Sequence, residues 1–145
     1  MDFFTSMEVS ASGLAAERTR MNMASSNMAN ANTTRGADGG AYKRKSVALE
    51  SVDVMRGPAL QFDNVFEGTA KGVRVAGIEE DQSPPRLEYD PGHPDSDING
   101  YIELPNVNVV EEMVDMITAS RAYEAGVTAL GTAVSMAERA TEIGS

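Results

Sequence analysis

The sequence contains no cysteine and no tryptophan, and a single histidine stands among its 145 residues. Without cysteine, neither a disulfide bond nor a thiolate-ligated metal site can form. The lone imidazole, His93, has no second histidine with which to share a metal ion, and it stands in a segment rich in turn-forming residues. We therefore interpret His93 as a turn residue and expect no catalytic centre, no cofactor and no small-molecule substrate.

Basic residues are also scarce, because 12 Lys and Arg face 22 Asp and Glu and give a net charge of −10. Nucleic-acid binding is disfavoured, since a phosphate backbone demands a basic face. The one basic run, Lys43–Lys45, is short and typical of a solvated loop or strand edge. No apolar run is long enough to span a bilayer, and the N-terminal residues lack the basic and apolar regions of a secretory signal. We expect neither membrane insertion nor a cleaved signal peptide.

Aromatic residues make up only 6% of the chain, so alanine, methionine and valine must supply most of the buried surface. Such side chains suit thin seams between helices better than a deep globular core. Apolar residues near the C-terminus recur at alternating steps of four and three, the spacing of a coiled-coil seam. The predicted seam consists of Val109, Met113, Met116, Ser120, Tyr123, Val127, Leu130, Val134 and Ala137.

The N-terminal segment carries a matching pattern with a seven-residue repeat and alanines beside it. Its repeating residues are Met7, Leu14, Met21 and Met28, flanked by Ala11, Ala15, Ala24 and Ala31. We predict a helix from about Thr5 to Asn30–Asn32, and a second one with Asn108 as its N-cap that continues to about Glu142, before Gly144. The two helices are expected to lie against each other.

Between the helices, short alternating segments are bounded by glycine and proline. They predict strands over 42–50, 72–78, 86–89 and 101–104, with a chain break at 56–58. The segment Asp95–Gly100 imitates the start of a calcium-binding EF-hand loop, but its twelfth position is Asn106 instead of glutamate. Prolines at 94 and 105 also deny the loop its flanking helices, so an acidic turn is the favoured interpretation, and the sequence leaves ion binding by 95–106 open.

Asparagines cluster at the end of the first predicted helix, at Asn27, Asn30 and Asn32. Asparagine tolerates the left-handed conformation that terminates helices. A buried asparagine can also fix register between packed helices, here between subunits. The sequence supports both interpretations equally.

Both ends of the chain resemble the terminal signatures of bacterial flagellar rod and hook proteins. The N-terminal match is Asn27-Met28-Ala29-Asn30-Ala31-Asn32-Thr33-Thr34-Arg35, and the C-terminal match is Pro105-Asn106-Val107-Asn108-Val109-Val110-Glu111-Glu112-Met113 with Arg121–Ala125. The resemblance departs from the family at Met28, where leucine is usual. The signature positions used below are Asn27, Ala29, Asn30, Asn32, Thr33, Pro105, Asn106, Asn108, Glu111 and Glu112.

This resemblance implies a structural subunit of the basal-body rod, exported by the flagellar type III apparatus and assembled with copies of itself and other rod subunits. It implies a periplasmic location and a hollow helical shaft that transmits torque. The expected fold is mainly α, with residues 1–34 and 106–145 forming a coiled-coil-like helical core and 35–105 a small β or irregular middle. The alternatives are a small soluble coiled-coil adaptor, and an enzyme, for which no catalytic constellation is visible.

Overall fold

The computed structural model describes residues 3–36, 39–54 and 70–143. Two helices enclose four strands in the order α1 (Phe3–Ala29), β1 (Lys45–Asp53), β2 (Lys71–Glu80), β3 (Arg86–Tyr89), β4 (Tyr101–Leu104) and α2 (Val109–Ile143). The chain is thus mainly α with a small β middle, as predicted. The expected break at 56–58 and the expected helix end at Gly144 lie outside the described residues.

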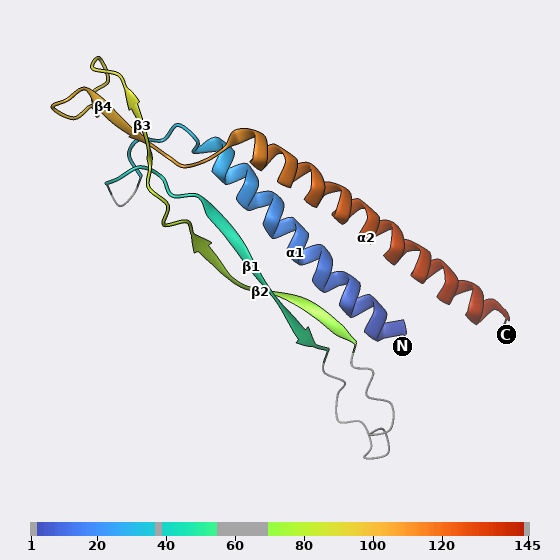
Figure 1. Cartoon of the computed structure of the whole chain (residues 1–145). Helices are drawn as coiled ribbons and strands as arrows, with labels where there is room; N and C mark the ends of the chain where they lie inside the picture. The colour runs from blue at the N-terminus through green and yellow to red at the C-terminus, as the bar shows by residue number, and fades with distance from the viewer. Residues whose placement is uncertain (1–2, 37–38, 55–69, 144–145) are drawn as a thin grey trace.

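The elements form an elongated molecule in which α1 lies between the β1–β2 hairpin and α2 (Figure 1). The helices run antiparallel, so that the first turn of α1 and the last turn of α2 lie at the same end of the molecule. Among the described elements, α2 packs only against α1, whereas α1 also packs against both β1 and β2. Neither helix is long and apolar enough to cross a lipid bilayer, within the residues that the structure describes.

The strands form two separate antiparallel hairpins, β1–β2 and β3–β4. The ranges of β3 and β4 are those predicted from the alternating pattern, while the first strand begins three residues later than predicted, at Lys45. A register shift between Ala48 and Leu49 leaves Ala76 of β2 without an opposite residue, which is a β-bulge. The β3–β4 hairpin projects beyond the helices at the end opposite the chain termini (Figure 1).

The covered side of α2 differs from the predicted seam at four positions. Val109, Met113, Val127 and Val134 are between 36% and 48% exposed and do not belong to the seam with α1. The less exposed residues of α2 still follow steps of four and three, but Met113, Val127 and Val134 are each replaced by the residue before them. The predicted Ser120 is half-buried beside the buried Ala119. The covered series is Glu112, Met116, Ala119, Tyr123, Gly126, Leu130, Ala133 and Ala137.

The difference has a steric reason. Ala119, Gly126 and Ala133 are small, so that the two backbones can approach closely, and at Gly126 the large residue comes from α1. A Cβ atom built on Gly126 would lie 2.9 Å from Cδ2 of Leu14. On α1 the predicted residues Met7, Leu14, Met21 and Met28 are half-buried and Ala24 and Ala31 are buried, but Ala11 and Ala15 are exposed. Hydrophobicity favoured valine and methionine on α2, whereas size complementarity selects the smaller neighbours.

Both helix boundaries follow local chemistry. Asn108 caps α2, since its Oδ1 accepts the backbone N–H of Val110 at 3.1 Å. At the end of α1 the side-chain amide Nδ2 of Asn30 donates a hydrogen bond to the backbone carbonyl of Ser26 at 2.8 Å. The start of α1 was predicted too late, because Thr5 lies inside the helix.

The close approach at Gly126 can be tested against Gly131 in the same helix. Alanine at Gly131, where a Cβ meets nothing within 4 Å, should stabilise the protein by about 1 kcal/mol through helix propensity. Alanine at Gly126 gains the same propensity but must displace Leu14, so its net gain should be clearly smaller or negative. Urea unfolding of both variants measures the difference; equal gains would contradict the tight seam.

Candidate functional site

A buried polar cluster joins the two terminal helices to the first strand, and its centre is Asn27 of α1, which is 1% exposed. Its Oδ1 accepts the backbone N–H of Lys45 at 2.9 Å and the hydroxyl of Tyr42 at 3.0 Å. Its Nδ2 donates to the carbonyl of Lys45 at 2.8 Å and to Oε2 of Glu112 at 2.9 Å. Both acceptor sites and both donors of the carboxamide are therefore used.

The side-chain amide of Asn27 pairs with β1 as the backbone of a neighbouring strand would. It binds the N–H and the C=O of the same residue, Lys45, which is the two-point pattern of an antiparallel pair. Lys45 is the first residue of β1, and these bonds occupy its backbone groups on the side away from β2. The side chain thereby caps the strand edge at that point and fixes where α1 crosses the hairpin.

Glu112 brings α2 into the same cluster and is 2% exposed. Its Oε1 accepts Nε of Arg44 at 2.6 Å, and Arg44 also lies 3.7 Å from a carboxylate oxygen of Asp115. The hydrogen bond to Glu112 raises the pKa of the Arg44 guanidinium above its ordinary value. A carboxylate in the first turn of α2 also faces the positive end of the helix dipole. Arg44, the Asn27 side-chain amide and the dipole of α2 thus all stabilise the buried Glu112 carboxylate.

Every oxygen and amide of this cluster is occupied by a partner within the chain. Among the described residues no buried side-chain nitrogen or oxygen lacks a hydrogen bond. Both carboxylate oxygens of Glu112 accept a hydrogen bond from a residue outside α2, so the arrangement serves to hold three elements in register. The cluster connects α1 through Asn27, β1 through the backbone of Lys45, and α2 through Glu112. We call it the Asn27–Glu112 lock.

A second tie holds α1 to the far end of the hairpin. Ser12 Oγ accepts the backbone N–H of Val73 in β2 at 3.1 Å and donates to the carbonyl of Val9 at 2.7 Å. The neighbouring Gly72 is buried, and a Cβ atom there would lie 3.0 Å from Ser12 Oγ. The close approach of helix and strand therefore requires glycine at position 72.

The structure separates the two interpretations of the asparagine cluster. Asn30 terminates α1, where its Oδ1 also accepts the hydroxyl of Thr33 at 3.2 Å, while Asn32 and Ala29 are exposed. Asn27 is the residue that fixes register, but it does so between elements of one chain. A contact of Asn30 or Asn32 between subunits stays a prediction.

The remaining signature residues connect β4 to α2. Pro105 and Val107 are buried, Asn106 is half-buried, and Asn108 provides the cap described above. Glu111 is exposed and, unlike its neighbour Glu112, points away from α1. The C-terminal signature thus turns the chain from the hairpin into the helix and delivers Glu112 to the lock.

The acidic segment Asp95–Gly100 forms a turn, as predicted. Asp97 Oδ1 accepts the backbone N–H groups of Tyr101 at 2.9 Å and Asn99 at 2.8 Å. These bonds, led by that from Tyr101, lower the pKa of the Asp97 carboxyl. Gly100 has a φ of 84°, and a Cβ there would lie 2.9 Å from the Tyr89 ring, so this turn requires glycine. No cluster of histidine and carboxylate ligands suited to a metal occurs in the described part of the chain.

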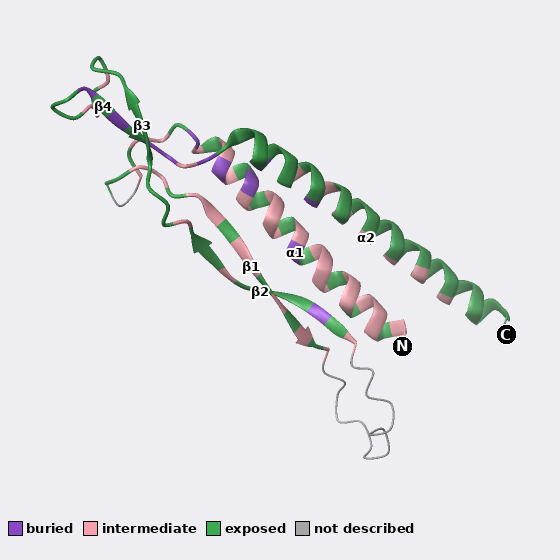
Figure 2. Cartoon of the chain, viewed as in Figure 1, coloured by how far each residue is buried: buried purple, intermediate pink, exposed green. Residues whose placement is uncertain are grey.

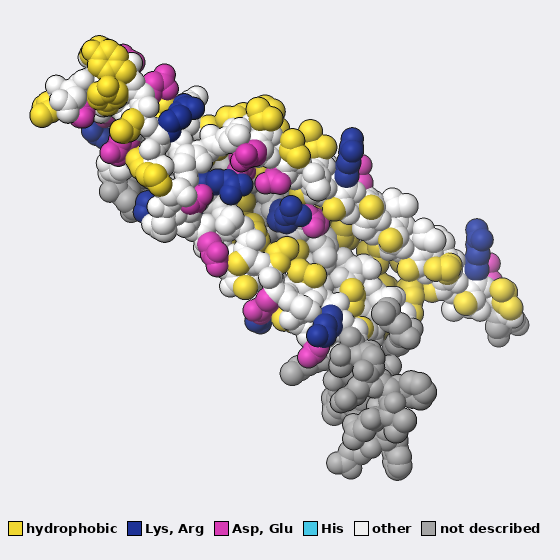
Figure 3. All heavy atoms as spheres, in the orientation of Figure 1, with side chains coloured by type: hydrophobic (Ala, Val, Ile, Leu, Met, Phe, Trp, Pro, Cys, Tyr) yellow, Lys and Arg dark blue, Asp and Glu magenta, His cyan; other side chains and the backbone are white. Residues whose placement is uncertain are grey.

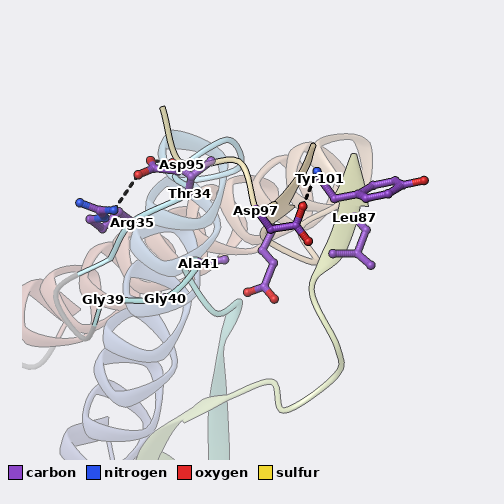
Figure 4. Close-up of a pocket in the computed structure, with 10 residues that line it drawn as sticks. Thr34, Arg35, Gly39, Gly40, Ala41, Leu87, Asp95, Asp97 and Tyr101 are labelled. Atoms are coloured by element: carbon purple, nitrogen blue, oxygen red, sulfur yellow. Dashed lines mark hydrogen bonds and ion pairs between the residues drawn. The ribbon is translucent and has the colours of Figure 1, made fainter. Parts of the chain in front are cut away.

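A polar hollow of about 210 Å³ lies between this turn and the segment that follows α1 (Figure 4). Asp95 closes one side by pairing with Arg35 at 2.8 Å and accepting the hydroxyl of Thr34 at 2.9 Å. The hollow is smaller than typical small-molecule pockets, which start at about 300 Å³. These contacts fasten the β3–β4 hairpin to the end of the N-terminal signature.

Sequence reasoning missed Tyr42, Arg44 and Lys45 as members of the lock. The basic run was interpreted as solvated, and nothing in its spacing indicates a partner 68 residues away along the chain. A signal exists on the other side of the contact. Once the seam of α2 is taken through Ala119 and Gly126, Glu112 falls on the covered side, where a carboxylate demands a cation.

Replacing Asn27 with Asp tests the lock. The change removes the Nδ2 donor and places a second carboxylate against Glu112, so it should destabilise the protein by about 3 kcal/mol or more. Asn22→Asp makes the same chemical change on the exposed side of α1 and should stay within about 0.5 kcal/mol of the parent. Urea unfolding monitored by circular dichroism compares them; equal losses in both variants would show that the lock contributes nothing.

Two family models match the chain at the places where the lock is built. The model described as flagella basal body rod protein matches residues 7–37, and the one described as flagellar basal body rod FlgEFG protein C-terminal matches residues 98–143. The first contains Asn27 and the second contains Glu112. Both signatures that the sequence suggested are therefore recognised independently.

Full-length relatives extend the match to the whole chain. The flagellar basal-body rod protein FlgC of Borreliella burgdorferi is 47% identical, with 99% of this chain and 98% of the relative covered. FlgC of Bacillus subtilis is 42% identical over 99% of both chains, and FlgC of Salmonella typhimurium is 41% identical over 94% of both. Identity of this extent, together with both terminal matches, shows that the chain belongs to the FlgC family of flagellar basal-body rod proteins.

Proposed function

We propose that the chain assembles through its terminal helices into the hollow helical shaft of the proximal rod, which crosses the periplasm and transmits torque. Family membership makes it a structural subunit of the flagellar basal-body rod and not an enzyme. In this proposal, residues 1–34 and 106–145 form the coiled-coil-like packing unit and 35–105 the small outer region. Copies of the chain and other rod subunits are its neighbours.

The observation that carries the proposal is the uncovered surface of α2. This helix of 35 residues buries only Glu112 and Ala119 fully, and most of its residues are exposed (Figure 2). Large apolar side chains recur along that surface (Figure 3). Among those that flank the covered series, Val110 is 68% exposed, Val114 58% and Ile117 51%. Apolar patches of this kind mark interaction sites.

Delivery to the periplasm is part of the same proposal. The resemblance implies export as an unfolded chain by the flagellar type III apparatus, without cleavage of a signal peptide. The fold suits such delivery, because it depends on hydrogen bonds, one buried ion pair and side-chain packing, which form without oxidative chemistry or a metal.

Two aspartate substitutions on α2 separate folding from assembly. Leu130 is half-buried in the seam with α1 and Val127 is exposed beside it. Leu130→Asp should lower the free energy of unfolding of the isolated subunit by about 2 kcal/mol or more. Val127→Asp should leave that stability nearly unchanged and yet abolish incorporation into basal bodies, because a charge would then be buried between subunits.

The measurements are urea unfolding of the purified subunit, swimming in soft agar and immunoblots of detergent-extracted basal bodies. Val127→Ala is the control, since it removes apolar surface without adding charge and should reduce swimming much less. Normal swimming and normal incorporation of the folded Val127→Asp variant would overturn the proposal that this helix face packs in the rod.

A further inference from the structure

The unpartnered face of α2 carries a regular row of large apolar residues. Val110, Met113, Ile117, Val127 and Val134 follow helical steps of three, four and their sums, and each is at least 36% exposed. We call these residues the α2 outer stripe. Within the chain, Gly126 of α2 receives the large side chain of Leu14 from α1. The outer stripe needs the opposite kind of partner, one that presents small side chains.

The exposed face of α1 has that character. Its exposed residues alternate in steps of four and three along nearly the whole helix. Between Glu8 and Ala29 this face presents Ala11, Ala15, Arg18, Asn22 and Ser25. None of these five exposed residues is large and apolar, so a facing helix with protruding side chains could approach the backbone of α1 closely. We call this surface the α1 outer stripe.

Charge also favours this pairing. Arg18 is exposed on the α1 outer stripe, and Glu124 is exposed on the same side of α2 as its outer stripe. Neither forms an ion pair within the described residues. The intrachain helices are antiparallel, with Leu14 opposite Gly126 and Asn27 opposite Glu112. In the same register, Arg18 of one copy comes within a helical turn of Glu124 of another.

We infer that the α2 outer stripe of one subunit docks on the α1 outer stripe of a second copy of this chain. The inference rests on the proposed function and names the partner of that surface. The two stripes are different surfaces, so each subunit offers one to each of two neighbours and the contact is head-to-tail. Such contacts extend without closing unless the rotation happens to complete a ring, and they generate a helical assembly.

The absence of cysteine from the chain permits a clean cross-linking test. Two differently tagged copies, one with Ala15→Cys and the other with Val127→Cys, are produced together in cells that lack the parent protein. Basal bodies are isolated and treated with a short bis-maleimide. The matched control replaces Val127→Cys by Ala122→Cys, which is also exposed but lies on the opposite side of α2. The yield of cross-link between the two tags should exceed the control several-fold.

A charge reversal tests the register independently. Arg18→Glu or Glu124→Arg alone should lower the cross-linking yield and the swimming diameter, and cells that carry both substitutions in one chain should recover both. Recovery in the double variant supports the pairing of these two residues between copies, because each isolated change merely creates a repulsion.

Three results would overturn the inference. They are equal cross-linking at 122 and 127, a predominance of products that join two Val127→Cys copies, and failure of the double charge variant to recover. If Val127→Asp still blocks incorporation while the Ala15–Val127 pair gives no cross-link above the control, the proposed rod function stands and this pairing is wrong. If Val127→Asp incorporates normally, the proposed function itself fails.

Discussion

The fold depends on the side-chain amide of Asn27, which connects α1 to β1 and α2 through hydrogen bonds. Asn27 is the only residue whose side chain contacts both the backbone of β1 and a side chain of α2 in the described hydrogen-bond network. Its geometry leaves no choice of register, because a strand-like pair to Lys45 and a bond to Glu112 can be made together from one position only. The ion pair between Arg44 and Glu112 then closes the remaining oxygen. Apolar burial is thin everywhere in this chain, so a specific polar contact supplies the precision that a larger core would otherwise give.

Thin burial also explains how one helix pair can offer two seams. The covered side of α2 carries Ala119, Gly126 and Ala133, while the larger Met113, Val127 and Val134 beside them are exposed. A compact globular protein would cover those valines and methionines with further elements. Here the middle of the chain forms hairpins that pack on α1 and beyond its end and leave α2 uncovered. The exposed apolar surface therefore follows directly from the choice of small residues inside.

The sequence predicted both helices, all four strands and the cap at Asn108, because these features depend on local periodicity and turn chemistry. It misplaced the seam on α2 by one residue at Met113, Val127 and Val134, since hydrophobicity does not report how closely two backbones approach. It identified Asn27 and Glu112 as signature residues but assigned no contact between them. Arg44 was taken for a solvated cation, and only the three-dimensional arrangement shows that it neutralises a buried carboxylate.

The contact between Asn27 and Glu112 spans 85 positions along the chain, so a process that supplies the polypeptide from its N-terminus can complete the fold only after most of the chain is present. A nascent or partly translocated chain possesses α1 and both hairpins before it possesses the carboxylate that Arg44 requires. Until Glu112 is present, Arg44 lacks its hydrogen-bond acceptor and one N–H of the Asn27 side-chain amide lacks its partner on α2. The hydrogen bonds of Glu112 can therefore form only in a chain that includes α2. A fragment that ends before α2 cannot complete the fold.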